Sequence, residues 1–111
     1  MEHTMNLQSS PFAKIREGSK IYELRLYDEK RKSIRVGDTI RFRCGEDQLR
    51  VRVLELLPFP TFDDLYRSLP LTQCGYAPEE LDTASPKDME LYYSKEEQSK
   101  YGVLAIKIAL I

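Results

Sequence analysis

Three charged side chains near the start of the chain, Lys20, Glu23 and Arg25, have the spacing of a small polar site. Glu23 and Arg25 stand two residues apart in a segment that alternates in polarity, so on a strand they point to the same face. Lys20 precedes them at a turn. We expect the three to line one cleft, where Lys20 holds a phosphate or carbonyl oxygen and Arg25 makes a bidentate contact, while Glu23 accepts from a base or orients Arg25. The alternative is an exposed ion pair between Glu23 and Arg25, worth under about 1 kcal/mol, beside a solvated lysine.

Catalysis is a second use of the same residues. Lys20 would act as a general base with Glu23 assisting, on a modified nucleoside or on RNA. It would then have to lose its proton near neutral pH, which burial or the nearby Arg25 would promote. A third reading is a protein-interaction module without chemistry. In the first two readings Glu23→Ala is expected to weaken binding or turnover while changing stability little, because a polar cleft residue makes few apolar contacts.

A second candidate site is a set of arginines on two neighbouring strands, Arg41, Arg43, Arg50 and Arg52. A four-residue hairpin loop at Gly45–Gln48 would place Arg43 opposite Arg50 and Arg41 opposite Arg52. Like charges in facing positions destabilise a sheet, so we expect compensation from the acidic second half of the chain or from an external polyanion such as RNA. The alternative is a solvated outer face whose arginine stems cover apolar surface.

Charge, cysteine content and the absence of known motifs limit the classes of protein to which this chain can belong. Residues 1–60 hold 12 Lys and Arg against nine Asp and Glu, whereas residues 61–111 hold five against nine, so a basic first half faces an acidic second half. Cys44 and Cys74 lie far from each other and from the only histidine, His3, so we expect free thiols, no metal and no cofactor. Free thiols and the lack of a secretory signal or membrane-spanning run favour a cytoplasmic protein. Triad, Walker and dinucleotide-binding patterns are absent from the sequence, which excludes the common enzyme classes that use them.

Local patterns predict one domain over residues 1–111, with disorder as one expectation for an N-terminal segment at residues 1–8. The expected helices are 11–17, started by Ser10-Pro11 and stopped at Gly18, then 61–69, 85–93 and 94–102. The expected strands are 20–26, 39–44, 49–57 and 103–111. The last is nearly all apolar and should lie in the centre of the sheet. Residues 70–84 show little periodicity and are expected to form a long loop. Seven tyrosines offer stacking platforms for bases or fill the core: Tyr22, Tyr27, Tyr66, Tyr76, Tyr92, Tyr93 and Tyr101.

The segment from Gly18 to Arg25, read as Gly-x-Lys-x-x-Glu-x-Arg and followed by Gly37-Asp38 before a strand, resembles the signature of the ASCH family. This is the activating-signal-cointegrator homology domain, a member of the PUA-like barrels. Pro11–Gly18 and the tyrosines near the end of the chain extend the likeness. The resemblance implies an α+β fold, a mixed β-barrel of five to six strands flanked by short helices. It also implies a positively lined cleft suited to RNA or a nucleotide-like ligand.

One branch of this family resembles amidohydrolases that remove acetyl from acetylated cytidine with a lysine, a threonine and a distant glutamate. Lys20 matches the lysine, but Glu23 stands where that branch has its threonine. The departure removes the hydroxyl on which that chemistry depends. A further carboxylate would have to come from Glu79 or Glu80 in the long loop.

Overall fold

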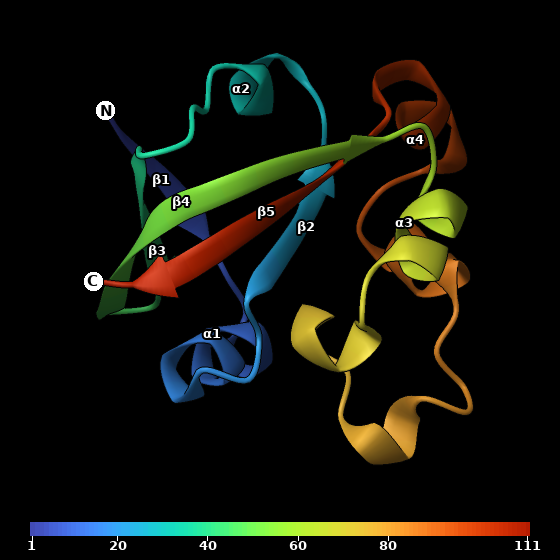
Figure 1. Ribbon diagram of the computed structural model, residues 1–111, viewed down its shortest axis with the longest axis horizontal. Helices are drawn as coiled ribbons and strands as arrows, with labels where there is room; N and C mark the ends of the chain where they lie inside the picture. The colour runs from blue at the N-terminus through green and yellow to red at the C-terminus, as the bar shows by residue number, and fades with distance from the viewer.

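The computed structural model describes residues 1–111, which fold into one curled sheet with helices at its sides (Figure 1). The strands are β1 (Glu2–Asn6), β2 (Tyr22–Leu26), β3 (Thr39–Cys44), β4 (Asp47–Phe59) and β5 (Val103–Leu110). The α-helices are α1 (Ser9–Glu17), α2 (Glu29–Lys32), α3 (Phe62–Ser68) and α4 (Lys95–Tyr101), and the 3-10 helices are η1 (Leu71–Cys74), η2 (Pro78–Glu80) and η3 (Pro86–Leu91). None of the helices has the length and apolar character that a membrane span requires.

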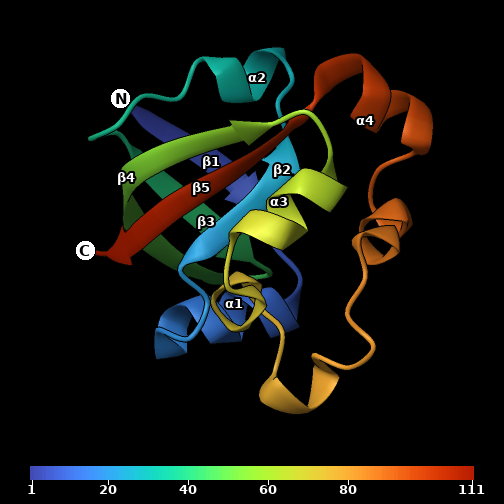
Figure 2. The ribbon, with the colours of Figure 1, turned by 45° about the vertical axis from the view of Figure 1, so that its right-hand side comes forward.

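The sheet has the strand order β1-β3-β4-β5-β2, so β1 and β2 are its edges. Neighbouring strands are antiparallel except β1 and β3, which are parallel. Figure 2 shows the sheet coiling into a half-barrel. Two side chains cross its open side: Arg25 Nη2 donates to the Asn6 carbonyl at 3.0 Å, and Lys30 Nζ donates to the Thr4 carbonyl at 3.3 Å. The expected α+β fold with a mixed barrel of five to six strands is confirmed, with five strands and one side left open.

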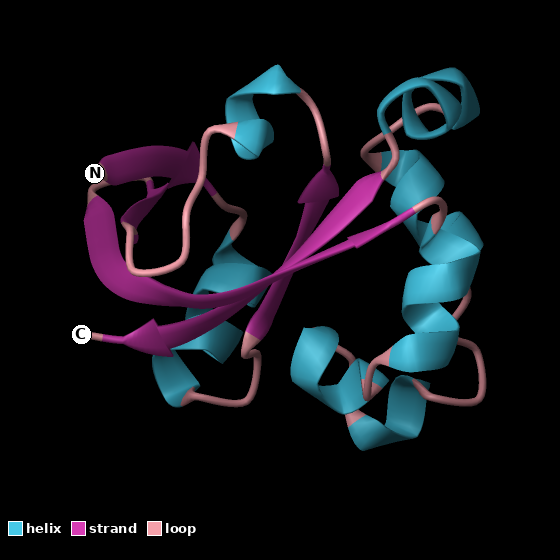
Figure 3. Cartoon of the chain, turned by 45° about the horizontal axis from the view of Figure 1, so that its top comes forward, coloured by secondary structure: helices cyan, strands magenta, loops and turns pink.

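Two apolar clusters hold the sheet from its two faces. Eleven buried residues fill the inside of the half-barrel, among them Phe42 and Ile106, and α1 closes this cluster with Phe12. Nine more pack on the outer face, where Phe62 of α3 lies near Ala105. Figure 3 shows α3 and the short helices that follow it on a different side of the sheet from α1. Because β5 contributes to both clusters, it is buried on both faces, as its apolar sequence predicted.

The N-terminal segment forms an edge strand, so the expectation of disorder for residues 1–8 is wrong. β1 pairs with β3 from Glu2 to Asn6, and Met5 is buried in the inner cluster. His3 is buried as well, and its Nε2 lies 2.8 Å from Asp38 Oδ2. This hydrogen bond is the main reason why the pKa of Asp38 is lowered to about 2. The sequence did not predict β1, because only alternate residues of this short segment are buried. Their partners also lie 35 or more positions later in the chain.

The β3–β4 hairpin turns more tightly than the sequence predicted. Cys44 pairs with Asp47, which leaves a two-residue turn at Gly45-Glu46 in place of the four-residue loop. Gly45 has φ +59°, and a glycine with positive φ at the first central position suits a two-residue hairpin turn. The predicted facing pairs are therefore wrong: Arg41 lies opposite Arg50. The register shifts by two residues, so the arginines keep a common sheet face.

Capping residues set most helix ends where the sequence predicted them. Gly18 closes α1 in the left-handed conformation, with φ +87°. The Thr61 hydroxyl accepts from the Asp64 N–H at the start of α3, and Ser94 and Glu97 form a capping box on α4. The start of α1 is corrected: the helix begins at Ser9, and no side chain caps it. The predicted loop 70–84 contains the 3-10 helices η1 and η2, and the predicted helix 85–93 is the 3-10 helix η3.

Candidate functional site

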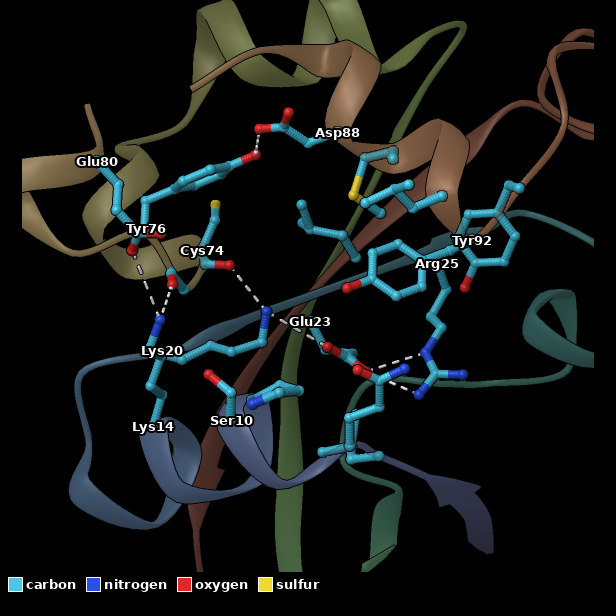
Figure 4. Close-up of a pocket in the computed structure, with 18 of the residues that line it drawn as sticks. Ser10, Lys14, Lys20, Glu23, Arg25, Cys74, Tyr76, Glu80, Asp88 and Tyr92 are labelled. Atoms are coloured by element: carbon cyan, nitrogen blue, oxygen red, sulfur yellow. Dashed lines mark hydrogen bonds and ion pairs between the residues drawn. The ribbon is translucent and has the colours of Figure 1, made fainter. Parts of the chain in front are cut away.

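A cavity of about 430 Å³ lies beside the free edge of β2 (Figure 4). Its walls come from the end of β1 with α1, from β2 and the turn before it, and from α3 with the segment that follows it as far as Tyr93. Lys20, Glu23 and Arg25 all line it, so the structure brings together the three residues that the sequence singled out. Their part in binding stays a prediction.

Lys20 is held in place by two acceptors. Its side chain is only 7% exposed, and its Nζ donates to the Cys74 carbonyl at 2.8 Å and lies 3.4 Å from Glu23 Oε1. The turn at Gly18-Ser19 carries the chain from α1 into β2 and sets Lys20 just before the strand. An ammonium group has three N–H donors. One donor is therefore left for a ligand in the cavity.

The Glu23 carboxylate is buried between two cations. Arg25 Nη2 and Nε lie 2.9 and 3.0 Å from Glu23 Oε2, while Lys20 approaches Oε1. The side chain of Glu23 is 5% exposed and that of Arg25 is 14% exposed, so the exposed ion pair weighed as the alternative is wrong. Burial alone would lower the pKa of Arg25, but Glu23 and the nearby Tyr93 outweigh it and raise that pKa. Glu23 thus orients Arg25, and its removal would leave two cations unpaired.

A chain of hydrogen bonds forms the opposite wall. Tyr76 donates its hydroxyl hydrogen to Asp88 Oδ2 at 2.7 Å, and the hydroxyls of Tyr66 and Tyr76 are also 2.7 Å apart. Since the hydrogen of Tyr76 is used on Asp88, Tyr66 is the donor in the second bond. Burial raises the pKa of Tyr66 to about 12, and burial with these two hydrogen bonds raises that of Tyr76 further. Both phenols are therefore neutral at ordinary pH.

A second lysine tethers the loop on this wall. Lys14 of α1 donates to the Gly75 carbonyl and lies 3.8 Å from Glu80 Oε1, so Glu80 reaches the cavity as an ion-pair partner, whereas Glu79 does not line it. Gly75 has φ +110°, and a Cβ there would meet Lys20 at 3.4 Å. Cys74 is a buried, free thiol whose pKa burial raises to about 11, and Cys44 is also free.

Charges in the cavity balance. Three cations and three carboxylates line it, Lys14, Lys20, Arg25, Glu23, Glu80 and Asp88. Each cation has a carboxylate partner within 3.8 Å. The positively lined cleft that the family resemblance implied is therefore not found at this cavity.

The rim of the cavity is apolar and exposed. Leu91 is 84% exposed and Tyr92 is 58% exposed, and both line the opening. Tyr93 turns inward instead and stacks on Phe62, with ring centroids 6.3 Å apart. Of the tyrosines noted in the sequence, Tyr92 is thus the one presented as a platform at the cavity.

The arginine face lies on β3 and β4, and none of its four arginines lines the cavity. Glu2 of β1 bridges the facing pair, with Oε2 3.1 Å from Arg41 and Oε1 2.7 Å from Arg50. The compensating charge therefore comes from the N-terminal strand, not from the acidic half of the chain. Arg43 and Arg52 are exposed and have no carboxylate partner, although Arg52 donates to the Gly37 carbonyl at 3.1 Å.

Several cavity residues were not identified as site residues from the sequence: Asn6, Lys14, Asp88 and Leu91. The Asp88 carboxylate carried a local signal only as the partner of Ser85 in a helix cap, and it plays that part as well, accepting from the Ser85 N–H at 3.2 Å. No local pattern connects it to Tyr76.

The sequence and the fold resemble those of known proteins. Residues 5–111 match the ASCH domain family. The crystal structure of hypothetical protein PH0355 aligns over 100% of both chains, with 34% identity and a TM-score of 0.85. The solution NMR structure of protein PF0455 from Pyrococcus furiosus aligns over 100% of this chain and 98% of its own, with 33% identity and a TM-score of 0.75. No match is found among curated proteins.

The open mixed half-barrel with short helices is thus a PUA-like domain. Within that class, the chain belongs to the ASCH family, as the Gly18–Arg25 signature predicted.

Proposed function

We propose that this ASCH domain binds RNA or a nucleotide-like ligand in the cavity beside β2. The observation that carries the proposal is the cluster of buried Lys20 and Glu23 with the partly buried Arg25 at a cavity of about 430 Å³, a volume within the usual range for small-molecule sites. The free N–H of Lys20 supplies a charge-assisted donor for a carbonyl oxygen. Membership of the family supports the same class of ligand.

The surroundings of Lys20 favour binding over general-base catalysis. A general base offers its lone pair to the substrate, whereas the Lys20 nitrogen faces two hydrogen-bond acceptors, the Cys74 carbonyl and the Glu23 carboxylate. Moreover, no hydroxyl stands at position 23 for the amidohydrolase chemistry that one branch of the family resembles. Release of acetate from acetylcytidine by the purified protein, lost in Lys20→Met, would decide for the hydrolase instead.

Tyr92→Ala tests whether a base stacks at the rim. Loss of one base-aromatic contact costs about 1–3 kcal/mol, so we expect the affinity for single-stranded RNA to fall about 5- to 150-fold in a titration. Folding should be unaffected, because the ring is 58% exposed. Tyr101→Ala is the matched control, since Tyr101 does not line the cavity. Equal RNA affinities for the two variants would show that the rim is not part of the binding site.

A salt titration tests whether the arginine face contacts the RNA backbone. Arg43 is in register with Asn6, which lines the cavity, so this face begins next to it. If Arg43 and Arg52 each neutralise one phosphate, replacing both with Gln should reduce the slope of log K against log salt by about 1.4 for single-stranded RNA. The control is Arg41→Gln with Arg50→Gln, which removes the same charge from the pair that Glu2 already compensates. Identical salt slopes for the wild type and both double variants would show that the arginine face is a solvated surface without contact to RNA.

A further inference from the structure

The backbone of β2 presents unpaired groups at its free edge. β2 pairs with β5 alone, with Glu23 opposite Ile106 and Arg25 opposite Leu104. The flanking hydrogen bonds, Ile108 N–H to the Ile21 carbonyl and Tyr27 N–H to the Gly102 carbonyl, show that odd-numbered residues of this strand bond to β5. Bonded and non-bonded pairs alternate in an antiparallel ladder. The N–H and C=O of Leu24 therefore point away from β5.

Leu24 is the edge residue that reaches the cavity. It is 7% exposed and lines the wall, and no loop, turn or side chain bonds to its N–H or C=O. Just before the strand, Ile21 N–H donates to the Gln73 carbonyl at 2.8 Å, so the loop lies against the start of β2. Buried backbone groups nearly always have partners, since an unmade hydrogen bond is costly. A ligand with adjacent acceptor and donor atoms would satisfy both.

The pairing of charges in the cavity indicates which part of a nucleotide would bind there. Every cation of the cavity already contacts a carboxylate, Lys20 and Arg25 sharing Glu23 and Lys14 pairing with Glu80, so none stands free to pair with a phosphate. A neutral heterocycle fits this balance, and its face can stack on the exposed ring of Tyr92. The edges of nucleobases carry adjacent donors and acceptors, as the backbone edge requires.

We infer that the cavity takes the base of one unstacked nucleotide edge-on against β2. The Leu24 N–H donates to a ring or carbonyl acceptor of the base, and the Leu24 carbonyl accepts from the neighbouring N–H. The phosphate stays outside. This inference rests on the proposed function and adds to it the chemical class of the group inside the cavity.

Amide hydrogen exchange measured by NMR tests the inference, with cytidine, uridine, adenosine and guanosine as probes. In the free protein, the Leu24 amide should exchange faster than those of Glu23 and Arg25, which bond to β5. With the tightest-binding nucleoside at about 100 times its Kd, exchange at Leu24 should slow about 100-fold. The nucleoside and its 5′-monophosphate should bind with similar affinity, and ribose 5-phosphate should not bind.

The outcomes separate this inference from the proposed function. Nucleoside binding that shifts the signals of Lys20 and Tyr92 but leaves exchange at Leu24 unchanged would overturn the inference alone. Slow exchange at Leu24 in the free protein would do the same, because its N–H would then have an internal partner. Binding of the monophosphate or of ribose 5-phosphate far more tightly than the nucleoside would show that phosphate enters the cavity. If neither nucleosides nor single-stranded RNA bind, both proposals fail.

Discussion

Glu23→Ala is expected to lower the free energy of unfolding by about 3 to 5 kcal/mol, the usual cost of removing one partner from a buried ion pair. The carboxylate lies between Lys20 and Arg25 and is almost fully buried, so its loss leaves two cations in a poorly solvated place. This replaces the expectation from the sequence that the change would affect stability little. Chemical denaturation of the wild type and the variant measures the difference.

Glu55→Ala is the matched control for this prediction. Glu55 also stands on a strand and pairs with a lysine, Lys107, at 3.5 Å, but its side chain is 53% exposed. An exposed pair contributes about 0 to 1 kcal/mol, so the control should lose little. Adding Lys20→Met to Glu23→Ala should recover part of the lost stability, because one of the two unpaired cations is removed. Equal small losses for Glu23→Ala and Glu55→Ala would mean that water reaches Lys20 and Arg25.

Lys20→Met is expected to weaken nucleoside or RNA binding about 10- to 150-fold, because a hydrogen bond from a charged donor contributes about 1.5–3 kcal/mol. Methionine retains much of the aliphatic stem and removes the ammonium group. Glu23 keeps Arg25 as its partner, so the fold should tolerate this change better than Glu23→Ala. Calorimetric titration and denaturation of the same sample separate the loss of affinity from any loss of structure.

Lys107→Met controls for the removal of one positive charge, since Lys107 lies on β5 outside the cavity and its side chain is 32% exposed. Its affinity should stay close to that of the wild type. Unchanged affinity in a well-folded Lys20→Met protein would show that Lys20 serves only to hold the Cys74 carbonyl and the Glu23 carboxylate. The proposed function would then lose its main support.

The sequence alone determined the features that depend on neighbouring residues. Ser94 with Glu97 and Gly18 set helix ends, because a cap is completed within a few residues. The apolar run of Val103–Leu110 placed β5 in the centre of the sheet. Glu23 and Arg25 point to one face because side chains alternate along a strand. The family signature lies within the single stretch Gly18–Arg25, so it could be identified from the sequence alone.

The tertiary structure decided what depends on contacts between remote segments. Glu2 compensates the charges of Arg41 and Arg50 only because β1 pairs with β3. The far wall of the cavity, with Tyr76 and Asp88, reaches β2 because its segment packs on the outer face of the sheet. These pairings depend on the total apolar area buried and on hydrogen bonds between segments far apart in the chain. A local sequence pattern carries no information on either quantity. The burial of Glu23, and with it the expected cost of removing the carboxylate, followed only once those walls were in place.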